Sequence, residues 1–121
     1  MIRITGKPGE GAGTITGLII KSLLALGDEY IVFLIDDTSE FKPLGRELNA
    51  QFINLSMYIN EYDCTIIPFL DKLDFNKRFF IFDICSYNED DIFRKVLFSH
   101  LEDIKTRFGN RAFIFYKSVY Y

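Results

Sequence analysis

Short apolar runs recur along the chain, and each of them predicts a β-strand. Two of them, Tyr30–Ile35 and Phe79–Ile84, are almost continuously apolar, which is typical of strands that are buried on both faces of a parallel sheet. The five predicted strands are Met1–Thr5, Tyr30–Ile35, Gln51–Leu55, Phe79–Ile84 and Ala112–Tyr116.

Apolar positions with helical spacing lie between these runs, so strands and helices alternate. Ser56–Lys77 is less regular and predicts a loop with one short helix or strand, and Lys117–Tyr121 reads as a short tail. The alternation predicts an α/β fold with three layers, in which a mainly parallel five-stranded sheet carries helices on both faces. The first predicted helix spans Thr14–Leu26 and ends at Gly27. The second is capped by Thr38 or Ser39, runs to about Leu48 and ends at Asn49. The third is capped by Asn88, runs to about Phe108 and ends at Gly109.

Composition indicates an ordinary globular chain. It has 121 residues, of which 49% are hydrophobic and 26% charged, so we expect a single domain over residues 1–121. The net charge of -3 argues against direct binding of nucleic acid. Cys64 and Cys85 lack metal-ligand spacing and are expected to be reduced thiols. Without a signal peptide or a membrane-spanning apolar stretch, the expected location is the cytoplasm, with no membrane insertion.

The segment Gly6-Lys-Pro-Gly-Glu-Gly-Ala-Gly-Thr14 joins the first strand to the first helix. Strand, glycine-rich loop and helix is the layout in which backbone N–H groups hold a phosphate, with the pattern G-x-x-x-x-G-K-[ST]. Gly6 and Gly11 fit that pattern, whereas Ala12 stands in place of the lysine and Gly13 in place of the hydroxyl residue. The loop therefore predicts a phosphate-binding shape without its usual charged group.

Acidic residues follow two of the predicted strands. Asp36 and Asp37 end the second strand, and Asp83 lies near the end of the fourth. Ligands bind beyond the carboxyl ends of parallel strands, and a phosphate loop with a neighbouring acid is the arrangement that holds a nucleotide with Mg²⁺. A single Asp at a strand end is more often there for solvation alone.

These motifs resemble those of P-loop NTPases. The opening MIRITGKPGEGAGT is similar to their strand-GKxGxGK-[ST] segment, and Ile35-Asp-Asp-Thr-Ser-Glu-Phe41 resembles the second-strand segment of the FtsK/HerA group of DNA-pumping and conjugation ATPases. The resemblance covers about the first 56 residues. It implies a P-loop-like domain, a degenerate Walker A loop formed by Gly6, Gly9, Gly11, Gly13 and Thr14, and Asp83 as the acid on the metal side.

The ParA/MinD group is a second branch that the loop resembles, because Lys7 matches the additional early lysine of that group. The resemblance implies ATP or ADP with Mg²⁺ as ligands, with Lys7, Thr14 and Asp36 among the binding residues; the residues themselves establish no cofactor. Glu10 adds negative charge inside the loop, and Ile84 follows Asp83 where such ATPases usually carry a catalytic Glu. These departures predict no catalytic residues and argue against efficient ATP hydrolysis.

Three functions stay open. The first is a non-catalytic or weakly nucleotide-binding protein that acts as an accessory component, as a homo-oligomer or within a larger protein assembly. The second is an active ATPase in which Lys7 replaces the missing lysine. The third is a small dinucleotide-binding module, because Gly11, Gly13 and Gly17 form a glycine string and Asp36 or Asp37 lies at the end of the next strand.

Overall fold

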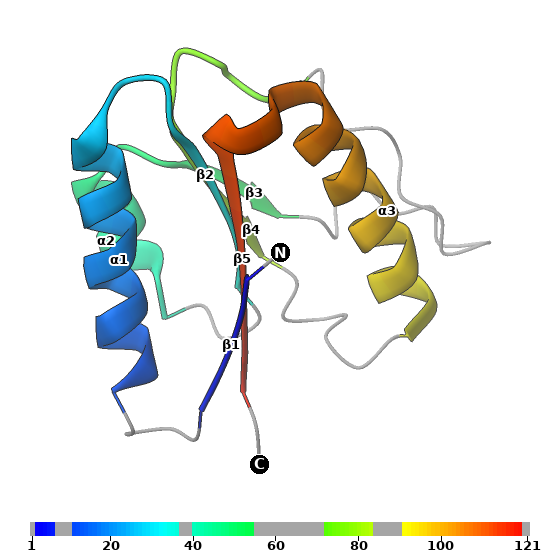
Figure 1. The fold of residues 1–121 in the computed structure, drawn as a ribbon. Helices are drawn as coiled ribbons and strands as arrows, with labels where there is room; N and C mark the ends of the chain where they lie inside the picture. The colour runs from blue at the N-terminus through cyan, green and yellow to red at the C-terminus, as the bar shows by residue number, and fades with distance from the viewer. Residues whose placement is uncertain (1, 7–10, 37–39, 55–71, 84–90, 120–121) are drawn as a thin grey trace.

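The structure is a computed structural model that describes residues 2–6, 11–36, 40–54, 72–83 and 91–119. Five strands form one sheet in the order β1-β5-β2-β4-β3, and every neighbouring pair runs parallel (Figure 1). The strands are β1 (Ile2–Gly6), β2 (Ile31–Asp36), β3 (Gln51–Asn54), β4 (Phe79–Asp83) and β5 (Ala112–Val119).

Helices cover both faces of the sheet, which gives the three layers visible in Figure 1. On one face lie α1 and α2, and on the other lies α3. The helices are α1 (Ala12–Leu26), α2 (Lys42–Glu47), α3 (Asp91–Phe108) and the 3₁₀ turn η4 (Gly109–Arg111). The α/β class with a parallel sheet and flanking helices is therefore confirmed.

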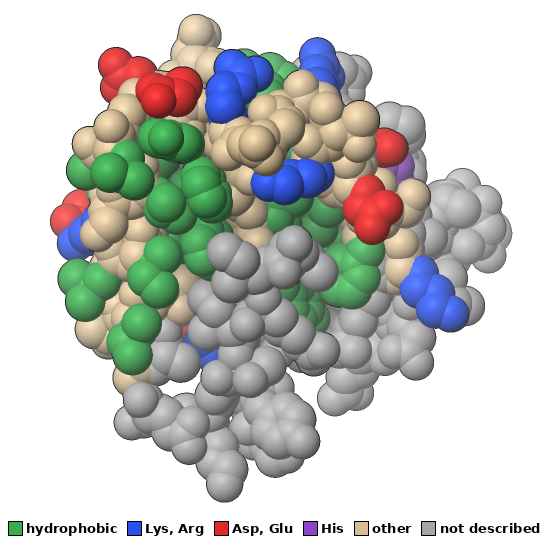
Figure 2. Space-filling view, viewed as in Figure 1, with side chains coloured by type: hydrophobic (Ala, Val, Ile, Leu, Met, Phe, Trp, Pro, Cys, Tyr) green, Lys and Arg blue, Asp and Glu red, His purple; other side chains and the backbone are tan. Residues whose placement is uncertain are grey.

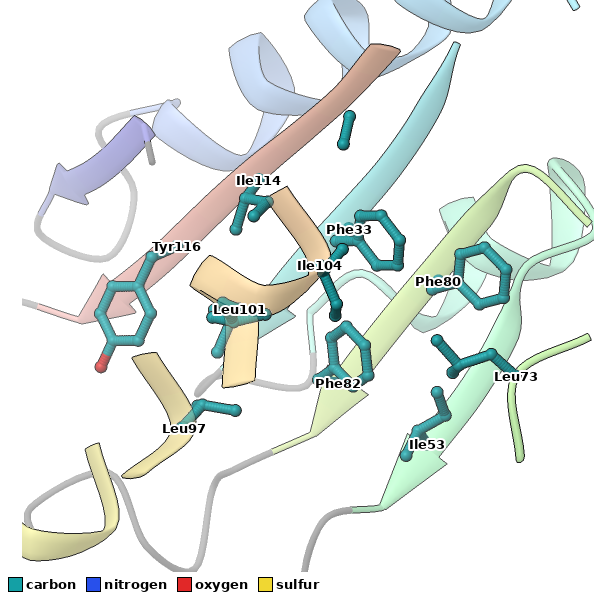
Figure 3. Close-up of a cluster of buried hydrophobic side chains, with 12 residues drawn as sticks. Phe33, Ile53, Leu73, Phe80, Phe82, Leu97, Leu101, Ile104, Ile114 and Tyr116 are labelled. Carbon is teal, nitrogen blue, oxygen red and sulfur yellow. The ribbon is translucent and has the colours of Figure 1, made fainter. Parts of the chain in front are cut away.

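The strand residues alternate between two hydrophobic clusters, one on each face of the sheet. Phe33 and Phe82 pack under α3 with Leu97 and Leu101, as Figure 3 shows. Their strand neighbours Val32, Leu34 and Ile81 belong to the opposite cluster, together with Ile20 of α1. Because successive side chains of a strand point to opposite faces, the central strands are apolar throughout.

The largest differences from the predicted boundaries are at the start of the second helix and at the end of the last strand. The second helix begins at Lys42 rather than just after Thr38 or Ser39, because Phe41 precedes it with its side chain in the core and its N–H donates to Asp36 Oδ2 at 3.3 Å. The predicted tail from Lys117 onward is instead the continuation of β5 as far as Val119. Backbone pairing with β1 and β2 on both sides extends this strand.

Other sequence-based predictions fall outside the described residues. These are the possible cap at Asn88, the thiols Cys64 and Cys85, the loop residues Lys7 and Gly9, and most of the Ser56–Lys77 segment.

Candidate functional site at the carboxyl edge of the sheet

Helix α1 follows β1 along the chain, as the glycine-rich segment between them predicts. Gly11 precedes the helix in the left-handed conformation, with φ of 80°, and no side chain caps the helix. The first intrahelical bond runs from the Ile15 N–H to the Gly11 carbonyl oxygen at 3.1 Å. The preceding N–H groups of such a first turn have no partner within the helix and favour an anion.

A carboxylate of the protein itself lies against this first turn. A Cβ atom placed on Gly13 would be 2.9 Å from Glu40 Oε1, so the absence of a side chain at Gly13 leaves room for the Glu40 carboxylate. The same oxygen, Oε1, lies 3.8 Å from Lys117 Nζ. The Lys117 side chain is only 5% exposed, whereas that of Glu40 is 43% exposed. Glu40 therefore bridges the start of α1 and a buried cation at the end of β5.

Four polar residues form a row across the carboxyl ends of the strands. Asp36 of β2 is aligned with Lys117 on one side and with Asp83 on the other, and Asp83 is aligned with Asn54 of β3. The alternation of side chains places all four on the face covered by α1 and α2, directly after the last apolar residues on that face. Charge and hydrogen-bonding groups thus collect where the sheet's hydrophobic surface ends.

Asp36 is the buried acid of this row, with 2% of the residue exposed. Its Oδ2 accepts a hydrogen bond from the Phe41 N–H, which ties the end of β2 to the segment that carries Glu40. A buried charge is costly unless it is paired or hydrogen-bonded. Lys117 is aligned with Asp36 on the neighbouring strand, so its opposite charge lowers the cost of burying the Asp36 carboxylate.

The strand order separates the two predicted acids. One strand, β5, lies between β1 and Asp36, whereas both β5 and β2 lie between β1 and Asp83. With neighbouring strands about 4.8 Å apart, Asp83 is about three strand spacings from the end of β1, and Asp36 about two. Asp36 is therefore the acid nearer to the start of α1. Within the described residues, no three His, Cys, Asp or Glu side chains form a group that could hold a metal ion.

The structure describes four of the predicted loop residues. Gly6 ends β1, Gly11 precedes α1, Gly13 lies in its first turn, and Thr14 is an exposed residue of that helix. Lys7 and Gly9 lie outside the described residues, so the substitute-lysine hypothesis remains a prediction.

Sequence reasoning missed Lys117 as a site residue and gave Glu40 no role in binding. Lys117 follows Phe113 and Phe115 at two-residue intervals, so it continues the row of side chains on the α1 face of β5. That period of two is a signal that could have placed Lys117 in the strand and at the sheet's carboxyl edge.

A hollow of about 470 Å³ lies between α3 and β5, away from this edge. Its lining includes Phe98, Leu101 and Ile114 with Glu102 and Lys105. Lys105 Nζ donates to the Ala112 carbonyl oxygen at 2.6 Å, which holds that lysine at the end of α3.

In comparisons with known proteins, no family, no curated protein and no solved structure matches this chain. None of the helices in the described part of the chain combines the length and the apolar character needed to cross a bilayer. The fold and the polar row define the class: an α/β protein with an all-parallel sheet and a charged cluster at its carboxyl edge.

Proposed function

We propose that this chain is a P-loop-like domain that no longer turns over nucleotide and acts through protein contacts, as an accessory component of a homo-oligomer or a larger assembly. The observation that carries the proposal is the Glu40 carboxylate at the first turn of α1, where the loop's layout would place a phosphate. A carboxylate of the fold beside this turn repels a phosphate that approaches it.

Charge around this turn supports the same proposal. Lys117, a buried cation at this edge, lies 3.8 Å from Glu40, and Asp36 lies on its other side along the row. A triphosphate at the turn would have to displace Glu40 and to approach Asp36, which repels it. Ala12 and Gly13 supply neither the lysine nor the hydroxyl that would offset this cost.

The test is a nucleotide-binding measurement by calorimetry and thermal shift, with ATP and ADP, each with and without Mg²⁺. The wild-type chain is expected to show no saturable binding. The double substitution Ala12→Lys with Gly13→Thr restores the missing groups and moves the Glu40 side chain aside, so it is expected to create affinity. Saturable binding of ATP by the wild type, with hydrolysis, would refute the proposal.

One observation favours an active nucleotide-binding protein as the second candidate. Lys117 contacts the carboxylate that lies on the first turn, so its ammonium group is within reach of an anion bound there once Glu40 is gone. Under this alternative, Glu40→Gln strengthens Mg²⁺–ATP binding and an added Lys117→Met abolishes it. Binding that survives Lys117→Met but is lost in Lys7→Ala would instead assign the phosphate contact to Lys7.

A further inference from the structure

The surface of α1 carries apolar side chains that the fold does not cover. Three of them are more than half exposed: Ile15 (59%), Leu18 (60%) and Leu26 (70%), and Ile19 is 42% exposed. Together with Ser22 and Leu23 they line a hollow of about 330 Å³. Figure 2 shows hydrophobic side chains gathered on the surface over this helix. We call these six residues the α1 patch.

The α1 patch is on the flank of the helix that faces away from α2. Lys21 Nζ contacts Glu47 Oε1 at 3.0 Å, which fixes the flank that faces α2. Successive residues are about 100° apart around a helix, so Ile15, Ile19 and Leu26 lie roughly opposite Lys21. Because α2 packs over β3 and β4, this opposite flank is directed toward the β1 side of the sheet.

The same side of the molecule has an open sheet edge. In the described part of the chain β1 pairs with β5 alone, so its outer backbone groups have no strand beside them. In Figure 1 the molecule is viewed with β1 in front, and the α1 patch is visible from that side in Figure 2. An exposed strand edge and an adjacent apolar surface are both features that a partner covers.

We infer that the α1 patch and the β1 edge form the interface of a two-fold symmetric dimer of this chain. A two-fold axis perpendicular to the sheet at the β1 edge places β1 against its copy in antiparallel pairing. The same rotation places α1 antiparallel to its copy on one face of the extended sheet. One operation thus covers both features, as an isologous interface requires. This inference deepens the proposed function and rests on it, because it names the partner as a second copy.

Charge supports a second copy as the occupant, and the apolar area sets how much the β1 edge has to contribute. The α1 patch contains no charged residue, and the lysine of α1 pairs with Glu47, so the α1 patches of two copies meet without charge repulsion. A fully exposed aliphatic side chain offers on the order of 100 Å² of apolar surface, so the four exposed residues contribute roughly 230 Å² per protomer. A stable interface buries about 800 Å² per partner, so the patch supplies its apolar core and the β1 edge must add much of the rest.

The antiparallel arrangement gives a charge test that is specific for a second copy. A two-fold axis that passes the middle of the α1 patch places Ile15, near the start of α1, opposite Leu26, near the end of the partner helix. The double substitution Ile15→Lys with Leu26→Lys therefore brings like charges together and is expected to weaken association at least about tenfold. Ile15→Glu with Leu26→Lys brings opposite charges together and is expected to retain it. Both substitutions sit at exposed positions, so the protomer fold is preserved.

The measurement is the solution mass by sedimentation and light scattering, from about 1 µM to about 500 µM, the range in which a modest interface associates. The wild type is expected to rise from 14.1 kDa toward twice that mass. The control, Ser99→Lys with Thr106→Lys, adds the same charge to exposed positions of α3 and should associate like the wild type.

A wild type that stays at 14.1 kDa throughout overturns the dimer, as does equal behaviour of the two charge variants. Nucleotide binding, measured on the same samples, separates the two ideas. A monomer that binds no nucleotide refutes the dimer alone, whereas a dimer that binds and hydrolyses ATP refutes the proposed function.

Discussion

Replacing Lys117 by Met tests whether the charged row stabilises the carboxyl edge of the sheet. The substitution keeps an unbranched, apolar stem in a site that is 5% exposed and removes only the ammonium group. At an effective dielectric constant of about 20, opposite charges 3.8 Å apart attract by about 4 kcal/mol before desolvation is subtracted. Removing one partner of a buried pair costs about 3–5 kcal/mol when the other charge stays buried.

Lys117→Met leaves Asp36 buried beside it, whereas Glu40, with 43% of its side chain exposed, can turn to water. We therefore expect a loss of about 2–3 kcal/mol in the free energy of unfolding, measured by urea denaturation. The matched substitution Glu40→Gln removes the exposed partner and should cost less than about 1 kcal/mol.

Adding Asp36→Asn to Lys117→Met tests the coupling between these two residues. The double variant should lose less stability than the sum of the two single variants, because neither charge is then left alone. A loss below about 1 kcal/mol for Lys117→Met, or an equal loss for Glu40→Gln, would refute the reasoning.

Three further stability predictions rest on contacts elsewhere in the fold. Gly45→Ala should cost about 1–3 kcal/mol in urea denaturation, because its Cβ would lie 2.5 Å from Phe52 Cζ; a neutral result would contradict the close packing of α2. Gly17→Ala, whose Cβ meets only Leu44 Cδ2 at 3.6 Å, should instead stabilise by up to about 1 kcal/mol. Arg78→Met should cost about 1–2 kcal/mol, since Arg78 donates to the Leu24 carbonyl oxygen at 2.8 Å; unchanged thermal unfolding would show this contact is dispensable.

The pattern of apolar residues was sufficient to predict the strands and the class of fold. Runs such as Tyr30–Ile35 have only one way to bury both of their faces, which is inside a sheet covered by helices. The position of each strand in the sheet was not accessible in the same way, because each crossover can pass over one strand or several. The separation of Asp83 from the end of β1 follows from that strand order, which the local sequence around Asp83 does not predict.

Helical spacing located α1 but did not show which of its sides is buried. Ile15, Leu18 and Leu26 predict the helix and yet lie on its exposed side, whereas Ile20 is fully buried. Lys21 is the helix's charged residue, so apolar residues surround it on nearly every side and the periodicity defines no unique face. For the same reason, the sequence alone did not predict that the α1 patch is exposed.

The position of β5 between β1 and β2 has a consequence for the order in which the chain can fold during synthesis. Of the described strands β1 is synthesised before the others, and its sheet neighbour among them, β5, is synthesised after the others. Until residues 112–119 emerge, β1 has no place in the sheet and β2 keeps one edge open. Between the synthesis of β1 and that of β5, the nascent chain therefore carries unpaired strand edges, the condition that favours capture by chaperones and misassembly between chains.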